Sequence, residues 1–283
     1  MPIPTSTTSA HAETLKSLHT PGKPLLLANV YNAASAALVA SHPGCRALAT
    51  ASYALAETIS KSDDTLTLQE NLSLTRPIAE VAAKQGLPLT VDVQDGYAPA
   101  GAYSTLAENI KMFITEFGAA GCNIEDSWHD FPEGKMMSED EAVERIKTVV
   151  KTAREVLGTG GFVVNARSDT FFLGGGELEE SIRRGKRYLE EGGATTVFIF
   201  WPRSKVMEKA DVQKVIDAFG GMVNISCRLG GDLSTTDLAA MGTARISVGP
   251  QLWLAEKNAR GQGVGEEQVQ RIVREKVGEV FGL

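Results

Sequence analysis

Eight short apolar stretches recur along the chain, and the segments between them repeat their apolar residues at helical spacing. Each stretch ends in polar or small residues, and this alternation predicts buried parallel strands covered by helices. The stretches are residues 25–31, 47–52, 88–94, 120–126, 161–167, 195–201, 222–227 and 244–249. Eight such strands indicate a closed (β/α)8 barrel, or TIM barrel, rather than an open doubly wound sheet, since no Gly-x-Gly-x-x-Gly motif follows the first stretch.

Capping residues mark several helix boundaries. Ser138 and Glu141 fit a capping box, in which each side chain accepts a hydrogen bond from the other residue's backbone N–H, and Gly158 closes the same helix. Thr105 and Glu108 offer a second box. We therefore expect a helix to begin at each of these two boxes.

The spacing of apolar residues predicts three further helices, over residues 67–85, 177–191 and 266–280. Pro77 removes one backbone hydrogen bond inside the first of them and is expected to kink or divide it. A chain of 283 residues is typical of a single barrel domain. We expect one domain over residues 1–283, with a flexible N-terminal segment at 1–20 and C-terminal helices at 251–283.

Composition argues against several classes of function. No apolar run approaches the roughly 18 residues of a membrane helix, so no membrane partner is expected. The net charge is −7 and the basic residues are scattered, which argues against nucleic acid as a partner. Cys45, Cys122 and Cys227 are widely spaced, which indicates buried free thiols rather than disulfides or a metal site. Without an apolar signal segment at the start, a cytoplasmic protein is expected.

Charged residues gather where the third, fourth and fifth predicted strands end. The active site of a barrel forms at these carboxyl ends, so Asp92, Glu125 and Asp169 are expected to converge there. Neighbouring carboxylates repel one another unless a cation holds them, and Mg2+ prefers oxygen ligands. A single strand-end aspartate is often only a helix cap. Three acidic strand ends together with Arg167 favour a metal site.

Three segments at these strand ends resemble the conserved blocks of one enzyme superfamily. Residues 91–97 read VDVQDGY, residues 121–126 read GCNIED, and residues 165–169 read NARSD. They resemble the D-x-D-x-G-[YF], G-x-x-[IL]-E-D and A-R-[TS]-D blocks of the isocitrate lyase and phosphoenolpyruvate mutase superfamily. The resemblance extends over residues 25–250 and implies a (β/α)8-barrel enzyme that acts on small carboxylic acids.

The resemblance also implies a divalent metal site. Asp92 corresponds to the direct ligand of Mg2+, or alternatively Mn2+, and Glu125 to a carboxylate that reaches the ion through water. Asp63 or Asp64 would be a third such carboxylate. Gln94 stands where the superfamily usually has a second aspartate, so it can accept a hydrogen bond from a water of the ion but brings no charge.

A small carboxylate substrate is implied beside the metal. Arg167 corresponds to the residue that neutralises its carboxylate, in keeping with the forked donors of arginine. Ser52, Tyr53 and Ala54 lie where the superfamily binds the keto acid, with Tyr53 in place of a smaller residue. Arg203 is a further candidate for an anionic group of the substrate.

The loop at residues 127–137 departs from the lyases of the superfamily. Isocitrate lyase and methylisocitrate lyase carry a K-[KR]-C-G-H sequence there, whereas this loop contains no cysteine. Cys122 lies inside the preceding strand and cannot replace it, so cleavage of isocitrate itself is not expected. His129 is the candidate acid or base in this loop, because histidine titrates near neutral pH.

Three functions remain open from the sequence. The resemblance favours a Mg2+-dependent lyase that cleaves a carbon–carbon bond of a small 2-oxo or 2-hydroxy acid through an enolpyruvate-like intermediate. A phosphonomutase that acts on a P–C bond is the alternative, since those enzymes also lack the loop cysteine. A barrel that binds a metabolite without catalysis is the third, because of Gln94. The resemblance further implies a homotetramer or a homodimer.

Overall fold

The strands of the chain form a single parallel ring. The computed structural model describes residues 4–129, 135–173, 177–202 and 205–282. Within these ranges eight parallel strands pair in the order β1-β10-β9-β8-β7-β4-β3-β2. They are β1 (Leu25–Leu27), β2 (Leu48–Ala49), β3 (Leu89–Asp92), β4 (Ala119–Glu125), β7 (Val163–Ser168), β8 (Thr196–Ile199), β9 (Val223–Ser226) and β10 (Arg245–Ser247). Each of the eight predicted stretches overlaps one of these strands, and only β4 and β7 extend beyond their stretches, by one residue each.

The first and second strands close the ring just beyond their ends. Val30 pairs with Thr50 in a parallel bridge, and Asn29 Nδ2 donates to the Thr50 carbonyl at 2.8 Å. Asn29 Oδ1 also accepts from the backbone N–H groups of Val248 and Gly249, at 3.2 and 3.0 Å, which follow β10. Asn29 therefore ties together the chain after β1, β2 and β10, and the predicted (β/α)8 barrel is confirmed.

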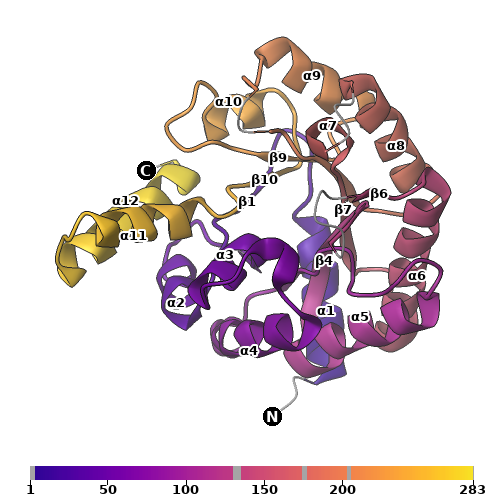
Figure 1. Cartoon of the computed structure of the whole chain (residues 1–283), viewed down its shortest axis with the longest axis horizontal. Coiled ribbons are helices and arrows are strands. Elements are labelled where there is room, and N and C mark those ends of the chain that lie inside the picture. Colours follow the sequence, from indigo (N-terminus) through magenta and orange to yellow (C-terminus); the bar gives the residue numbers. More distant parts are fainter. Residues whose placement is uncertain (1–3, 130–134, 174–176, 203–204, 283) are drawn as a thin grey trace.

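Helices surround the strands as an outer layer (Figure 1). A two-stranded antiparallel pair, β5 (Ser127–Trp128) and β6 (Lys135–Met136), follows β4. The helices are α1 (Thr5–Ser17), α2 (Ala33–Ala40), α3 (Ser52–Thr58), α4 (Leu68–Gln85), α5 (Tyr103–Phe117), α6 (Glu139–Leu157), α7 (Thr170–Leu173), α8 (Leu178–Glu190), α9 (Lys209–Ala218), α10 (Thr235–Ala240), α11 (Gln251–Gly261) and α12 (Glu266–Phe281), with a 3-10 turn, η1 (Asp63–Thr65). None of these helices in the described ranges is both long and apolar enough to cross a membrane.

Capping explains where the predicted helices begin and end. Thr67 and Glu70 form a reciprocal capping box at the start of α4, and Gly86 ends that helix in the left-handed conformation. Pro77 lies inside α4, which continues through it, so the predicted division of this helix is wrong. The long packed face of α4, with Ile78 and Ala79 buried, compensates for the missing hydrogen bond.

The capping box predicted at Ser138 is only half formed. Ser138 Oγ accepts from the backbone N–H of Glu141 and Gly158 ends α6, as expected. The Glu141 carboxylate instead accepts from Gly101 N–H and from the hydroxyl of Tyr103, at 3.1 and 2.7 Å, because the start of α5 lies beside it.

The second predicted box, at Thr105, is wrong. The cap of α5 is Ala102 and the helix begins at Tyr103, so Thr105 already lies within its first turn. The contact of Tyr103 with Glu141 holds this earlier start of the helix.

The N-terminal segment, which we expected to be flexible, forms α1 in its described part. Thr8, Ala12 and Leu15 are buried on one face of the helix, and this face packs on β4 and α6. The serine and threonine residues of the segment have low helix propensity. Burial at spacings of four and three residues overrides that propensity, so the prediction of flexibility at residues 4–20 is wrong.

The last two helices lie side by side and project from the barrel (Figure 1). Val269, Val273, Val277 and Val280 of α12 are buried within the chain itself. This apolar face is therefore covered by α11 and the barrel. At the end of α12 the ring of Phe281 stacks on His42, with centroids 4.5 Å apart.

Candidate active site

A cavity of about 880 Å3 opens among the strand ends and continues into the barrel. Its volume lies within the roughly 300–1,000 Å3 that is typical of small-molecule sites. Tyr53, Phe198 and Phe200 contribute aromatic walls. Its polar lining comes from Asp63 of the η1 turn and from residues that the strands carry, among them Asp92, Asn123, Arg167, Asn224 and Arg245.

Asp92 lies at the end of β3 with its carboxylate in this cavity. One carboxylate oxygen accepts from the backbone N–H of Ser52 at 2.9 Å, and the other from Asn123 Nδ2 at 3.0 Å. Only 9% of the residue is exposed. Each carboxylate oxygen has a second lone pair, so the group can still accept a ligand from the cavity side.

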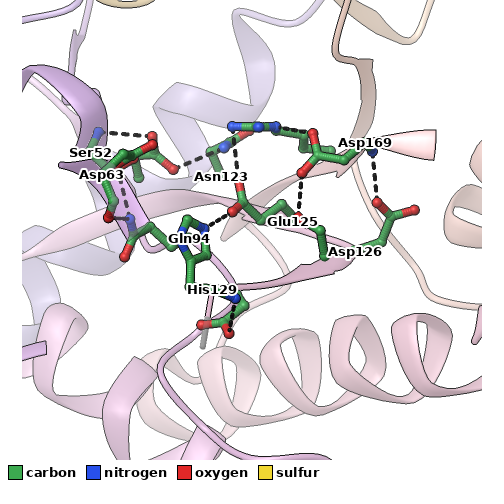
Figure 2. A network of polar contacts seen from close by, with 12 residues as sticks. Ser52, Asp63, Gln94, Asn123, Glu125, Asp126, His129 and Asp169 are labelled. Carbon is green, nitrogen blue, oxygen red and sulfur yellow. Dashed lines mark hydrogen bonds and ion pairs between the residues drawn. The ribbon is translucent and has the colours of Figure 1, made fainter. Parts of the chain in front are cut away.

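Asp63, rather than Asp64, lies at the cavity. Asp63 is half-buried and lines it, whereas Asp64 is exposed to solvent. Gln94 Nε2 donates to the Asp63 carbonyl and carboxylate at 2.7 and 2.9 Å (Figure 2). Burial raises the pKa of Asp63, and the negative charge of Asp92 raises it further.

Gln94 is held in an uncommon backbone conformation. Its φ is +51°, in the left-handed region that non-glycine residues rarely adopt. Its Oε1 is buried and has no hydrogen-bond partner among the described residues. This amide oxygen is therefore an open acceptor beside Asp63.

Glu125 and Arg167 form a buried ion pair above the cavity. Arg167 Nη1 lies 2.8 Å from Glu125 Oε2, and Arg167 Nε lies 2.6 Å from Asp169 Oδ1. The guanidinium also lies 4.2 Å from the centroid of the Phe200 ring. Burial lowers the pKa of Arg167, but Asp169 and Glu125 outweigh it and raise the pKa. Arg167 is thus a fixed cation at the cavity.

His129 contacts the other oxygen of Glu125 through Nε2 (Figure 2). Burial lowers the pKa of His129, but the Glu125 carboxylate outweighs burial and raises it to about 9. Burial raises the pKa of Glu125 to about 7, against the effect of Arg167. His129 therefore holds a proton near neutral pH. Residues 130–134 of the same loop lie outside the described residues.

Asp126 and Asp169 support the site without lining the cavity. Asp126 accepts from Asp169 N–H at 2.7 Å, from Ser168 Oγ at 3.1 Å and from the hydroxyl of Tyr188 at 2.5 Å. Asp169 accepts from Ser127 Oγ at 2.6 Å and orients Arg167. These two strand-end carboxylates hold the loops after β4 and β7 in place.

The predicted keto-acid site is only partly assembled. Ser52 and Tyr53 line the cavity, whereas Ala54 is buried and does not. The backbone N–H of Ser52 donates to the Asp92 carboxylate. Tyr53 is 38% exposed at the rim. Arg203 lies outside the described residues.

Sequence reasoning missed the amides inside the barrel. Thr196 Oγ1 donates to Asn165, Asn165 donates to Asn123, and Asn123 donates to Asp92, at 2.7, 2.8 and 3.0 Å. This chain of hydrogen bonds fixes the Asp92 carboxylate from four strands. The signal was present as polar residues two positions before the strand ends, since alternate residues of a strand face the same side.

The donor set of the cavity fits a hydrated divalent cation. In the described ranges no three His, Cys, Asp or Glu side chains are close enough together to enclose a metal ion. Mg2+ usually meets only one or two carboxylates and keeps its waters, so such an enclosure is not required. Asp92 and Asp63 repel one another, and Gln94 Oε1 is an open acceptor. A hydrated cation would offset the repulsion between the two carboxylates, and one of its waters would donate to Gln94 Oε1.

A TIM barrel with two carboxylates and a buried arginine at its strand ends belongs to the class of barrel enzymes that act on small anions. The model of the phosphoenolpyruvate phosphomutase family matches residues 15–266. The chain belongs to this family, and so is an enzyme of the phosphoenolpyruvate mutase and isocitrate lyase superfamily. No curated protein matches the chain.

Solved structures agree with this assignment. The chain is similar to a protein from Burkholderia cenocepacia J2315 that is provisionally described as a phosphonomutase, with 30% identity over 89% of this chain and 98% of that one and a TM-score of 0.77. The chain is 22% identical to phosphoenolpyruvate phosphomutase from Streptomyces platensis subsp. rosaceus, over 89% of this chain and 85% of that one, with a TM-score of 0.73. It is 21% identical to oxaloacetate acetylhydrolase in complex with the inhibitor 3,3-difluorooxalacetate, over 96% of this chain and 95% of that one, with a TM-score of 0.72. The last two show likeness of fold alone.

Proposed function

We propose that this protein is a Mg2+-dependent lyase that cleaves a carbon–carbon bond of a small 2-oxo or 2-hydroxy acid. The observation that carries the proposal is the placement of Asp92, Asp63 and Arg167 on one cavity. Members of the superfamily generally depend on a divalent metal. Asp92 would hold the ion directly, with Asp63, Gln94 and Glu125 contacting its waters. When bound, Mg2+ supplies positive charge that stabilises a developing enolate.

The protein's own residues would bind and orient the acid. Arg167 is fixed by Asp169 and Glu125, so its remaining donors can clamp the substrate carboxylate without moving. As the carbon–carbon bond breaks, the hydroxyl group of the 2-hydroxy acid, or of the hydrate that water forms from a 2-oxo acid, loses its proton and becomes the carbonyl or carboxylate of one fragment. The electron pair of the broken bond stays on the other fragment as an enolate, which then takes a proton. His129 holds a proton near neutral pH beside the cavity and is the candidate donor.

The choice of carbon–carbon cleavage is supported by one structural relative. Oxaloacetate acetylhydrolase bears a name that implies action on a 2-oxo diacid. Isocitrate cleavage is not proposed, since residues 127–137 contain no cysteine. Cys122 is buried in β4, where burial raises its pKa to about 12.

A phosphonomutase activity is the second candidate. The observation that favours it is the family match itself, together with the 30% identity to a protein provisionally described as a phosphonomutase. Such an enzyme would use the same Asp92 and Arg167 and would move a phosphoryl group instead of a carbon fragment.

One screen separates the candidates. The protein is incubated with oxaloacetate, substituted malates or phosphonopyruvate, each with Mg2+ or Mn2+. Carbon products are followed by mass spectrometry, and the P–C bond by phosphorus NMR. Release of a carbon fragment supports the lyase, and conversion of phosphonopyruvate alone supports the phosphonomutase. Absence of turnover with every acid would contradict both and leave a barrel that only binds a metabolite.

A further inference from the structure

The cavity extends below the strand-end site to Arg245, the first residue of β10. Barrel interiors are usually filled by branched apolar side chains. Here Thr90, Asn165, Asn224 and Arg245 line the interior part of the cavity instead. A polar, hollow barrel interior is costly unless something binds its polar groups.

Arg245 is a buried cation with open donors. Only 3% of the residue is exposed, and its Nε and Nη1 have no hydrogen-bond partner in the described part of the chain. Burial lowers the pKa of Arg245 to about 10, and the charges of Cys122 and Asp92 oppose this shift. The guanidinium is therefore still charged at neutral pH, and its Nε and Nη1 donors are left open by the described residues.

Two further buried polar groups that line the cavity also lack hydrogen-bond partners among the described residues. Asn224 is 1% exposed, and its Nδ2 donates to Ser247 Oγ at 3.0 Å, which leaves Oδ1 without a partner in the ranges described. Asn224 and Arg245 are paired in register on β9 and β10. Thr90 Oγ1 is also buried and unpartnered within those ranges. The three residues that carry these two donors, one acceptor and one hydroxyl all line the same cavity.

The negative charge of Asp92 acts on both arginines, Arg167 and Arg245. Both arginines line the same cavity as Asp92, so the strand-end site and the interior groups are connected through one cavity. Oxygen acceptors suit Arg245, whereas Asn224 Oδ1 requires a hydrogen-bond donor. A carboxylate next to a hydroxyl group supplies both.

We propose that Arg245, Asn224 and Thr90 form a second subsite, inside the barrel, that binds the distal carboxylate of the substrate and a hydroxyl group beside it. The proposal rests on the proposed function, in which the 2-oxo acid end lies at Asp92 and Arg167. It makes the substrate a dicarboxylic 2-oxo acid with a hydroxyl group near its far end. A monocarboxylic acid would leave the interior donors unpaired.

Matched acids test the subsite by calorimetry in the presence of Mg2+. Pyruvate and 2-oxoglutarate share one head group, and 2-oxoglutarate adds one methylene group and the distal carboxylate. 2-Oxoadipate tests the length. We expect the parent to bind the better diacid at least about tenfold more tightly than pyruvate, because charged hydrogen bonds contribute roughly 1.5–3 kcal/mol. Arg245→Met should lose this advantage and keep pyruvate affinity within about twofold. Arg167→Met should weaken both.

The hydroxyl group has its own comparison. The parent should bind 4-hydroxy-2-oxoglutarate about tenfold more tightly than 2-oxoglutarate, since the hydroxyl satisfies a buried acceptor. Asn224→Leu should remove that preference. If the preference persists in Asn224→Leu, the acceptor is not Asn224 and this half of the proposal is overturned.

A purely structural role of Arg245 predicts a different result. Removing an uncompensated buried charge should leave the melting temperature of ligand-free Arg245→Met at or above that of the parent. A lower melting temperature with unchanged diacid affinity would overturn the subsite. Should Arg245→Met not fold, the parent's preference for diacids and its reduction in Arg245→Lys decide the question.

Glutarate separates this proposal from the proposed function. It carries two carboxylates and no 2-oxo group. If no 2-oxo acid binds or turns over but glutarate binds and depends on Arg245, the lyase proposal fails and the subsite stands. If the parent turns over 2-oxo acids and Arg245→Met binds diacids as the parent does, the subsite fails alone.

Discussion

Arg167 is fixed from three sides, by Glu125, Asp169 and the ring of Phe200. Lysine has one point charge and cannot keep this geometry while it binds a carboxylate with two parallel hydrogen bonds. We expect Arg167→Lys to lower kcat/KM by about 10- to 100-fold, mainly through weaker substrate binding. Steady-state kinetics with the best acid of the screen measures the change. An unchanged affinity for 2-oxo acids would place the carboxylate site elsewhere.

The adjacent aspartates 63 and 64 provide a control for the metal site. Asp92→Ala should abolish measurable Mg2+ binding in calorimetry. It should also raise the activation free energy of turnover by on the order of 3–4 kcal/mol, as loss of a charge stabiliser does. Asp63→Ala should weaken binding, whereas Asp64→Ala should behave as the parent, because Asp64 is exposed and lies outside the cavity. Parental Mg2+ affinity in Asp92→Ala would refute the assignment.

His19 links the stability of the barrel to pH. Burial, together with the charge of Arg245, lowers its pKa to about 3. In the unfolded chain a histidine titrates near pH 6.5, so below that pH the unfolded chain takes up a proton that the folded chain does not. The stability from neutral His19 is complete above about pH 6.5 and is lost as the pH falls towards 3. His19→Gln should therefore show a smaller decrease in melting temperature between pH 7 and 4 than the parent. Equal slopes would mean that His19 has the same pKa in the folded and in the unfolded chain.

At the level of elements, the apolar stretches predicted each strand because burial on both faces leaves little room for polar residues. The same stretches gave no indication of the polar residues that line the barrel interior. Asn123, Asn165 and Asn224 lie inside them, and a prediction based on strand ends passes over residues two positions earlier. The choice between Asp63 and Asp64 depends on the η1 turn, which no periodic pattern specifies.

Helix α1 was missed for a related reason. Its order depends on partners that are distant in sequence, since Leu15 lies beside Gly121 of β4, where a Cβ atom would be 3.0 Å from the Leu15 side chain. Local composition contains no trace of this contact.

Leu15→Ala tests how much α1 contributes to the fold. Leu15 is fully buried, so its truncation should reduce the free energy of unfolding by about 2–5 kcal/mol. Thr14→Ala on the exposed face should change it little. Denaturant unfolding measures both variants. Equal stability of the two would mean that α1 detaches from the barrel in solution.

At the level of the whole molecule, the projecting pair of α11 and α12 is the natural place for contact between subunits (Figure 1). We propose a homotetramer and expect light scattering to give about four times the chain mass of 30.2 kDa. Because the apolar face of α12 is already buried within the chain, the contact must use other residues. A mass equal to that of one chain at micromolar concentration would exclude the assembly.

The clamp at Asn29 has a consequence for how the protein is made. β1 can pair with β10 only after residue 247 has been synthesised. Asn29 can accept a hydrogen bond from the backbone N–H of Gly249 only after residue 249 has been synthesised. Until then the first strands present an open edge, which is prone to pair with other chains. Nascent chains that stall before β10 should therefore aggregate or bind chaperones, and closure of the barrel should follow the emergence of β10 from the ribosome.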